Sequence, residues 1–223
     1  MNRAVVALET SGRAPSVAVR CGERSASADL ESERAHASDL LPTVDRLLRE
    51  VGARPSGIDA VLVGTGPGSY TGLRVGIATA LGIARGCDAR LRGVPSGETL
   101  CWAELRAGEE GTVLLDARAG EIYLARYLRT DDEVDILRAP CVLRPAEVGA
   151  EVARGGPIFG DAEALVASNL LPGAGARFRE GARPVARALL ELGAKRLERL
   201  GPVPPADVAP LYLRPFAVRT RRR

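Results

Sequence analysis

The sequence predicts an α/β protein built from two halves that share one order of elements, β-β-β-α-β-α. Two observations predict it. In each half, three short strand-like segments joined by turns precede a helical pattern. In each half, an acidic residue also ends the first strand, Glu9 in one and Asp116 in the other. We place the halves at residues 1–107 and 108–223, because glycine and charged residues accumulate between 105 and 111.

The first half opens with three strands and a helix. Runs at 4–8, 16–20 and 25–30 are apolar or alternating and are separated by turn residues, which predicts an antiparallel meander. A helix is expected at 38–50, with Ser38 as its N-cap. Its apolar residues form one stripe at a period of about 3.6 residues. The stripe comprises Leu40, Leu41, Val44, Leu47, Leu48 and Val51.

A buried strand at 59–63 completes this first unit and leads into a glycine-rich loop at 64–72. A helix rich in small residues is expected at 73–84, with its end near Gly86. Small residues on a helix permit another helix to approach closely. From the pattern alone, a subunit interface on the helices 38–50 and 73–84 and ordinary packing on the sheet are equally favoured.

The second half repeats this order. Strands are expected at 112–116, 121–128 and 134–142, followed by a helix that begins near Pro145 and a short strand at 157–160. Helices at 162–170 and 184–200 complete it, and Pro184 suits the first turn of the last one. Two such halves predict a duplicated ribonuclease-H-like fold, the architecture of actin-like ATPases.

Composition indicates a cytoplasmic protein without a membrane segment. The chain has 223 residues and a net charge of +3, and its basic residues are interspersed with acids, as on a solvated surface. No apolar run reaches the length of a signal peptide core or a membrane span. The cysteines, which show no metal-ligand spacing, are expected to be reduced thiols in the core. They are Cys21, Cys87, Cys101 and Cys141.

The C-terminal tail is rich in arginine. It carries Arg219, Arg221, Arg222 and Arg223. Such a tail could contact a nucleic acid, but a solvated terminus is the favoured interpretation.

The loop at 64–72 has two interpretations. It lies between a strand and a helix, where backbone N–H groups can bind a phosphate or carboxylate. It lacks the lysine of a P-loop and the spacing of a dinucleotide-binding motif. Its glycines would equally suit a tight turn with positive φ angles or close packing, and this second interpretation is slightly favoured.

Few residues could support catalysis or hold a metal. Glu9 and Asp116 end strands where an actin-like enzyme could hold a metal–water network, but both also suit turns and caps. His36 is the only histidine, which excludes a His-pair metal site, and a structural or interface role is favoured for it.

Several motifs together resemble the TsaB (YeaZ) family, and the resemblance spans nearly the whole chain. The strongest runs from 66 to 76 and contains Gly66, Pro67, Gly68, Ser69, Tyr70, Thr71, Gly72 and Arg74. The segments at 8–11, 16–19, 38–42, 93–96, 115–118, 160–161 and 212–215 follow in the expected order.

The resemblance implies a duplicated actin-like fold and a non-catalytic role. It implies pairing with a TsaD-type catalytic subunit and a TsaE-type ATPase, to modify the adenosine beside the anticodon of tRNA, which the chain would meet only through the complex. It also implies that homodimers can form. The implied pairing surface is the helices at 38–50 and 73–84. Its candidate residues are Leu40, Leu41, Val44, Leu47, Leu48, Leu73, Ile77, Ala80 and Leu81.

Departures from the catalytic relative indicate that no metal or cofactor is bound. The segment at 93–100, which resembles the relative's histidine-rich stretch, contains no histidine. Two alternatives stay open. One is an actin-like ATPase or small-molecule kinase that uses Glu9, Asp116 and the loop 64–72. The other, least favoured, is a metallopeptidase.

Overall fold

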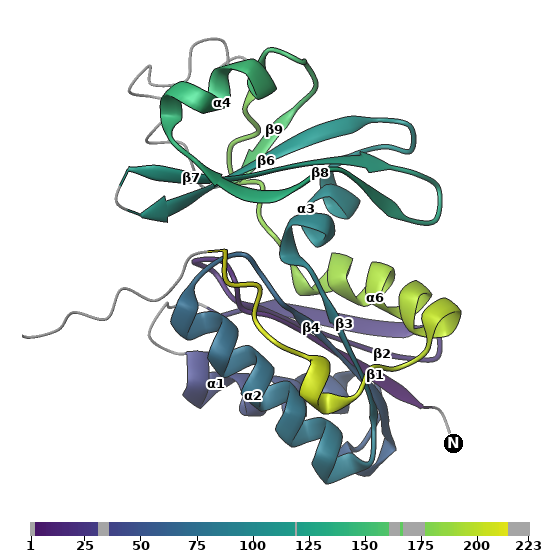
Figure 1. Cartoon of the computed structure of the whole chain (residues 1–223). Coiled ribbons are helices and arrows are strands. Elements are labelled where there is room, and N and C mark those ends of the chain that lie inside the picture. The colour runs from purple at the N-terminus through teal and green to yellow at the C-terminus, as the bar shows by residue number, and fades with distance from the viewer. Residues whose placement is uncertain (1–2, 31–35, 119, 161–165, 167–176, 214–223) are drawn as a thin grey trace, which may run out of the picture.

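A computed structural model gives the fold of the chain (Figure 1). It describes residues 3–30, 36–118, 120–160, 166 and 177–213, with only the backbone described at 36, 37 and 118.

The first sheet has the strand order β3-β2-β1-β4-β5. Its strands are β1 (Ala4–Glu9), β2 (Ser16–Cys21), β3 (Arg24–Asp29), β4 (Ile58–Gly64) and β5 (Arg90–Val94). The first three form an antiparallel meander, β4 lies parallel to β1, and β5 lies parallel to β4. The predicted meander and buried strand are therefore confirmed.

The second sheet repeats this arrangement in the order β8-β7-β6-β9. Its strands are β6 (Glu110–Arg118), β7 (Glu121–Arg129), β8 (Val134–Leu143) and β9 (Ile158–Gly160). Again three strands form an antiparallel meander, and the fourth lies parallel to the first. Because both sheets share this order, the duplicated ribonuclease-H-like fold is confirmed.

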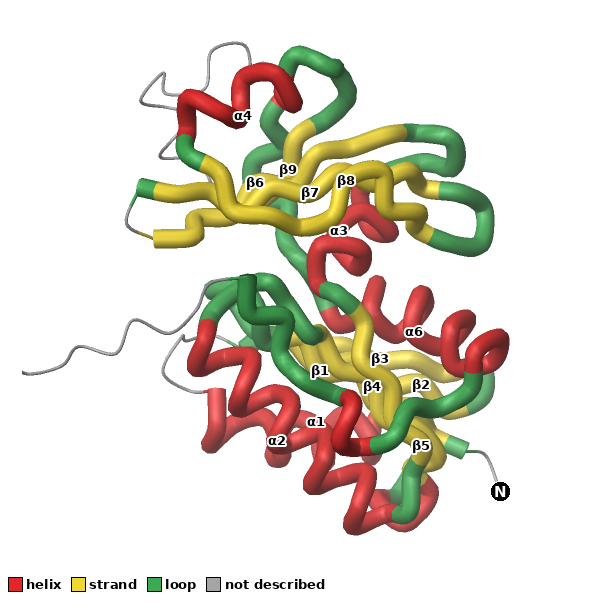
Figure 2. The backbone as a smooth tube through the Cα atoms, viewed as in Figure 1, coloured by secondary structure: helices red, strands yellow, loops and turns green. Residues whose placement is uncertain are grey.

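Helices cover both faces of the first sheet (Figures 1 and 2). Helices α1 (His36–Glu50) and α2 (Tyr70–Cys87) lie on one face, and α6 (Ala186–Leu200) lies on the other. Helix α3 (Ser96–Glu104) lies between the two sheets, and α4 (Pro145–Val152) covers the outer face of the second. Two short 3-10 turns occupy Pro55–Gly57 and Pro205–Asp207.

The core divides according to these layers. Alternate residues of β1 and β4 point in opposite directions: Val6 and Val63 pack in the cluster under α1 and α2, while Ala7 and Leu62 pack in the cluster with α3 and α6. Strands buried on both faces read as continuous apolar runs, which is why both segments are almost entirely apolar. A third cluster fills the space between α4 and the second sheet.

The structure differs from the prediction in several places. Strand β5 and helix α3 were not predicted, and α1 and α2 begin earlier than expected, so that Ser38 lies inside α1 instead of capping it. Helix α6, which we expected to belong to the second half, packs on β1, β2 and β4 of the first. The predicted helix at 162–170 lies almost wholly outside the described residues, and the boundary near 107 stays a prediction.

Candidate functional site

The glycine-rich loop is packed against the chain segment that follows β1. The backbone N–H of Ser69 donates to the carbonyl of Ser11 over 2.7 Å. A Cβ on Gly68 would lie 2.3 Å from that carbonyl oxygen, and one on Gly72 would lie 2.1 Å from the carbonyl oxygen of Thr10. Only glycine fits at these contact distances. Close packing therefore accounts for both glycines.

Helix α2 begins within this segment, at Tyr70. The Ser69 side chain is its N-cap and accepts a hydrogen bond from the N–H of Gly72 over 3.2 Å. The Thr10 hydroxyl donates to the carbonyl of Gly72 over 2.8 Å and binds the first turn to the end of β1. Gly66, with φ of +95°, occupies the left-handed region that favours glycine.

Glu9 lies at the end of β1 and is only 1% exposed. Its Oε1 accepts hydrogen bonds from the Ser11 N–H at 2.9 Å and the Ser96 hydroxyl at 3.2 Å. Its Oε2 has no hydrogen-bond partner among the described residues and lies against Gly64. Burial raises the pKa of the Glu9 carboxyl, and the hydrogen bonds from Ser11 and Ser96 oppose this. The carboxyl is thus enclosed by the chain's own groups.

Ser96 is a site residue that we did not single out from the sequence. It begins α3, and its hydroxyl oxygen accepts from the N–H of Gly66 at 3.1 Å while its own N–H donates to the carbonyl of Gly66 at 2.8 Å. Ser96 therefore connects the glycine-rich loop to the helix between the sheets. The signal was present in the family motif at 93–96, but the pattern could not show what the serine contacts.

Glu9 and Asp116 belong to different sheets. Asp116 lies in β6 of the second sheet and is half-buried, and the hydrogen bonds described for Glu9 come from Ser11 and Ser96. Among the described residues, no group of three or more His, Cys, Asp or Glu side chains could hold a metal ion. His36 begins α1, and its side chain lies outside the described part.

Most of the candidate interface residues are buried inside the chain. Those that lie in the core are Leu40, Val44, Leu47, Leu48, Leu73, Ile77 and Ala80. They pack on the first sheet, because the apolar stripes of α1 and α2 are the faces that cover it. Of the nine candidates, only Leu41, which is 54% exposed, and the half-buried Leu81 reach the solvent, and the pairing surface stays a prediction.

The outward face of α2 carries other small residues. Ala78, Gly82 and Gly86 are exposed, and a Cβ on either glycine would meet no atom of the described residues within 4 Å. Gly82 lies well inside the helix, where glycine costs stability relative to alanine. Unlike Gly72, it has no contact with the described residues that requires a glycine.

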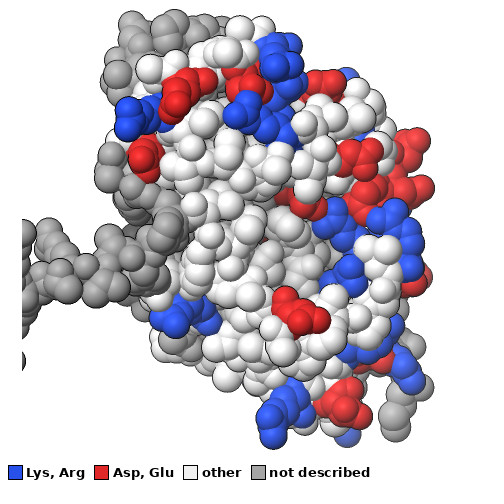
Figure 3. All heavy atoms as spheres, viewed as in Figure 1, with Lys and Arg blue, Asp and Glu red and all other residues white. Residues whose placement is uncertain are grey.

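An aromatic cluster stands at the start of this face. The ring of Tyr70 lies 5.3 Å from that of Tyr212, which belongs to the C-terminal segment, and the guanidinium of Arg74 stacks 4.9 Å from the Tyr70 ring centre. Figure 3 shows that the lower half of this face, which contains the first sheet and its helices, is mostly uncharged and carries a few separate charged side chains. In the described part of the chain, no helix has the length and apolar character to cross a membrane.

Comparison with known proteins gives consistent matches. The family described as TsaD, tRNA N6-adenosine threonylcarbamoyltransferase, matches residues 30–167. The tRNA threonylcarbamoyladenosine biosynthesis proteins TsaB of Haemophilus influenzae and Escherichia coli are each 35% identical, over 57% and 58% of this chain. The matches cover 55% and 57% of those two proteins, so the chain spans about half the length of the curated relatives it matches.

Solved structures extend the likeness to nearly the whole chain. A Pseudomonas aeruginosa protein described as similar to the peptidase YEAZ is 30% identical, with a TM-score of 0.83. The match covers 95% of this chain and all of that one. A second structure, YeaZ from the same organism, is 29% identical with the same TM-score and coverage.

Proposed function

Because this chain belongs to the TsaB (YeaZ) family of TsaD-related proteins, we propose that it is a non-catalytic scaffold in the threonylcarbamoylation of tRNA. It works in the cytoplasm with a TsaD-type catalytic subunit and a TsaE-type ATPase, and it meets tRNA only through that complex. It carries no cofactor or metal. The same partner-binding face could instead bind a second copy of the chain.

The observation that carries this proposal is the outward-facing glycine of α2. A glycine inside a helix costs about 0.5–1 kcal/mol relative to alanine, and no described residue makes a contact with Gly82 that would explain it. A small residue on a helix surface lets the backbone of a second helix approach closely. Ala78 stands one turn before Gly82 on the same face, and Leu41 projects from the adjacent α1.

The enclosed Glu9 supports the non-catalytic part of the proposal. A nucleotide-binding carboxylate must reach a metal ion or its water, whereas Glu9 is buried and accepts hydrogen bonds from Ser11 and Ser96. The loop at 64–72 likewise packs on Thr10 and Ser11. These contacts favour the scaffold over the ATPase or kinase.

The interface is tested with matched surface variants. We expect Leu41→Asp and Gly82→Leu to weaken binding to the TsaD-type subunit at least about tenfold, since each disturbs a close apolar contact. Ile136→Asp is the control, because Ile136 is also 54% exposed but lies on β8 of the second sheet. Binding is measured by sedimentation velocity or calorimetry. Wild-type affinity in both α1–α2 variants would remove the assignment of this face.

The catalytic role is tested by reconstitution. The chain, the TsaD-type and TsaE-type proteins, ATP, the threonylcarbamoyl donor and tRNA are combined, and each protein is omitted in turn. We expect modified tRNA only when the catalytic subunit is present. Modification by this chain alone, or ATP binding that is lost in Glu9→Ala, would favour the enzyme.

A further inference from the structure

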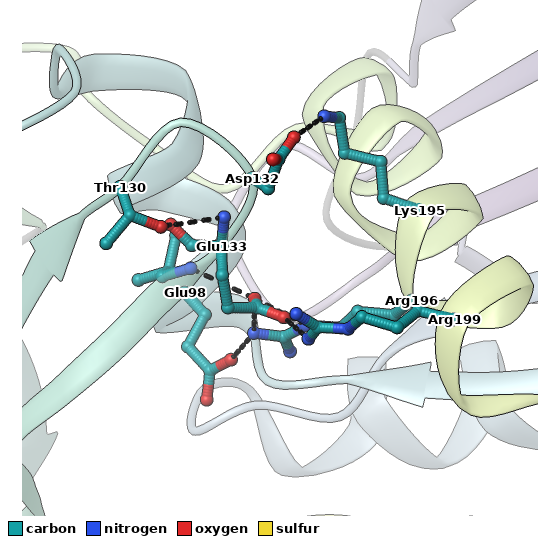
Figure 4. Close-up of polar contacts among 8 residues, drawn as sticks. Glu98, Thr130, Asp132, Glu133, Lys195, Arg196 and Arg199 are labelled. Atoms are coloured by element: carbon teal, nitrogen blue, oxygen red, sulfur yellow. Dashed lines mark hydrogen bonds and ion pairs between the residues drawn. The ribbon is translucent and has the colours of Figure 1, made fainter.

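The two sheets meet at a cluster of charged side chains from three separate parts of the sequence (Figure 4). Arg196 of α6 lies at its centre. One of its terminal nitrogens is 2.5 Å from Oε2 of Glu98, on α3, and its Nε donates to Oε1 of Glu133 over 2.8 Å. Glu133 precedes β8 in the β7–β8 turn, and it also pairs with Arg199 of α6.

The central groups are largely removed from water. The side chains of Glu98, Arg196 and Glu133 are 6%, 12% and 16% exposed. An ion pair at this degree of burial is costly to break, because separation leaves an uncompensated charge in a poorly solvated place. The β7–β8 turn is closed by hydrogen bonds between its ends: the N–H of Glu133 donates to the Thr130 hydroxyl over 3.0 Å, and the N–H of Thr130 donates to the carbonyl of Glu133 over 2.9 Å.

A second layer of contacts surrounds this centre. Lys195 of α6 pairs with Asp132 of the same turn at 2.5 Å. The guanidinium of Arg129, at the end of β7, stacks 3.3 Å from the ring centre of Trp102 on α3. The Trp102 indole N–H donates to Glu191 of α6 over 3.2 Å.

Helix α6 is in turn attached to the first sheet. A Cβ on Gly193 would lie 2.9 Å from a methyl carbon of Leu62 in β4, so the helix rests directly on that strand. The N–H of Ala186 donates to the Ser16 hydroxyl on β2 over 2.8 Å. The charged cluster therefore connects a helix held by the first sheet to a turn that belongs to the second.

We propose that Glu98, Glu133 and Arg196 form a latch that holds the two sheets at a fixed angle and prevents them from opening and closing. Proteins that close around a ligand need a hinge that is free to move, whereas this junction is bound on both sides by buried ion pairs. The latch makes the chain a rigid body. A partner docked on α1 and α2 would then find the second sheet at one constant position.

The latch is tested by a distance measurement between the sheets. Exposed Ser27 on β3 and exposed Asp135 on β8 are replaced by cysteine for spin labels, in a background with Cys87→Ser and Cys141→Ser. We expect double electron–electron resonance to give one narrow distance distribution in this background. The double variant Glu98→Gln with Glu133→Gln should broaden the distribution at least about twofold.

Two further variants keep the test decisive. Asp132→Asn is the matched control, because its side chain lies in the same turn but is 80% exposed, and it should leave the width unchanged. If the double variant does not fold by circular dichroism, Glu133→Gln alone removes the charge that faces α6 and should still broaden the distribution. A folded variant that lacks the Glu133 charge and keeps the background width would overturn the latch.

Discussion

At the scale of single residues, the environment of Glu9 decides its chemistry. A carboxyl at the end of β1 could hold a metal or a nucleotide if it were open to solvent. Here one oxygen accepts from the Ser11 N–H and the Ser96 hydroxyl, and the other lies against Gly64. The absence of a side chain at Gly64 is what allows the carboxyl to fit. Glu9 is thus part of the internal packing of the loop.

The raised pKa of Glu9 makes stability depend on pH. Burial raises the pKa of the Glu9 carboxyl above its ordinary 4.5. The carboxyl therefore makes its full contribution to stability below pH 4.5, and this contribution is lost as the pH rises through the folded-state pKa. We expect Glu9→Gln, which carries no charge, to gain stability relative to wild type between pH 5 and pH 8. Relative to wild type, the free energy of unfolding of Glu9→Gln should rise by about 1.4 kcal/mol for each pH unit between 5 and 8 that lies below the folded-state pKa of Glu9.

Urea unfolding at the two pH values measures this difference. The comparison across pH cancels any constant cost of the new amide group. Glu104→Gln, which makes the same substitution at an exposed position at the end of α3, is the matched control. A stability difference for Glu9→Gln that does not change with pH would show that Glu9 does not titrate as we infer.

At the scale of elements, helix α2 has glycines on both its inner and its outer face, and the two faces use them differently. On the inner face, a Cβ on Gly76 would lie 2.1 Å from the Thr10 hydroxyl oxygen, so the helix approaches the end of β1 closely. On the outer face, a Cβ on Gly82 would meet no atom within 4 Å in the part of the chain that the structure describes. The first glycine serves the fold of the chain, and we assign the second to a partner.

The two faces predict substitutions of opposite sign within one helix. Gly76→Ala should destabilise the isolated chain by about 1–3 kcal/mol, because the methyl group overlaps a buried, hydrogen-bonded threonine. Gly82→Ala should stabilise it by about 0.5–1 kcal/mol, since the helix gains propensity without a clash. Denaturant unfolding of each variant measures both. Effects of the same sign would contradict the division of α2 into two faces.

At the scale of the whole molecule, the halves are interlocked. The chain completes the second sheet and then returns, so that α6 covers the first. Helix α3 packs on α6 and on the second sheet. The cluster that contains Ala7 and Leu62 of the first sheet also contains Tyr127 and Phe159 of the second. Neither half can lose its structure without exposing apolar surface of the other.

This interlocking predicts a single unfolding transition. Trp102, the only tryptophan, lies at the junction of α3, α6 and the end of β7, so its fluorescence reports on the contact between the halves. We expect its thermal transition to coincide with the loss of helix and strand seen by far-ultraviolet circular dichroism. A fluorescence change at clearly lower temperature would show that the halves separate before they unfold.

The sequence by itself determined the α/β class, the doubled order of elements and most of their positions. Periodicity and turn residues are local signals, and they sufficed for the two meanders, α1, α2 and the strands β4 and β9. They did not suffice for β5, where arginines alternate with apolar residues, or for α3, which buries polar and apolar residues alike. The motif at 66–76 also located the loop of the candidate site.

Only the tertiary structure decided what covers each element. A helical stripe shows that Leu40 and Leu47 share a face, but it does not show whether a sheet or a partner protein covers that face. In this structure the first sheet covers it. The same holds for the assignment of α6 to the first sheet, for Ser96 beside Glu9, and for the ion pairs of Arg196. These contacts join residues far apart along the chain, and no local pattern records which distant surface a residue meets.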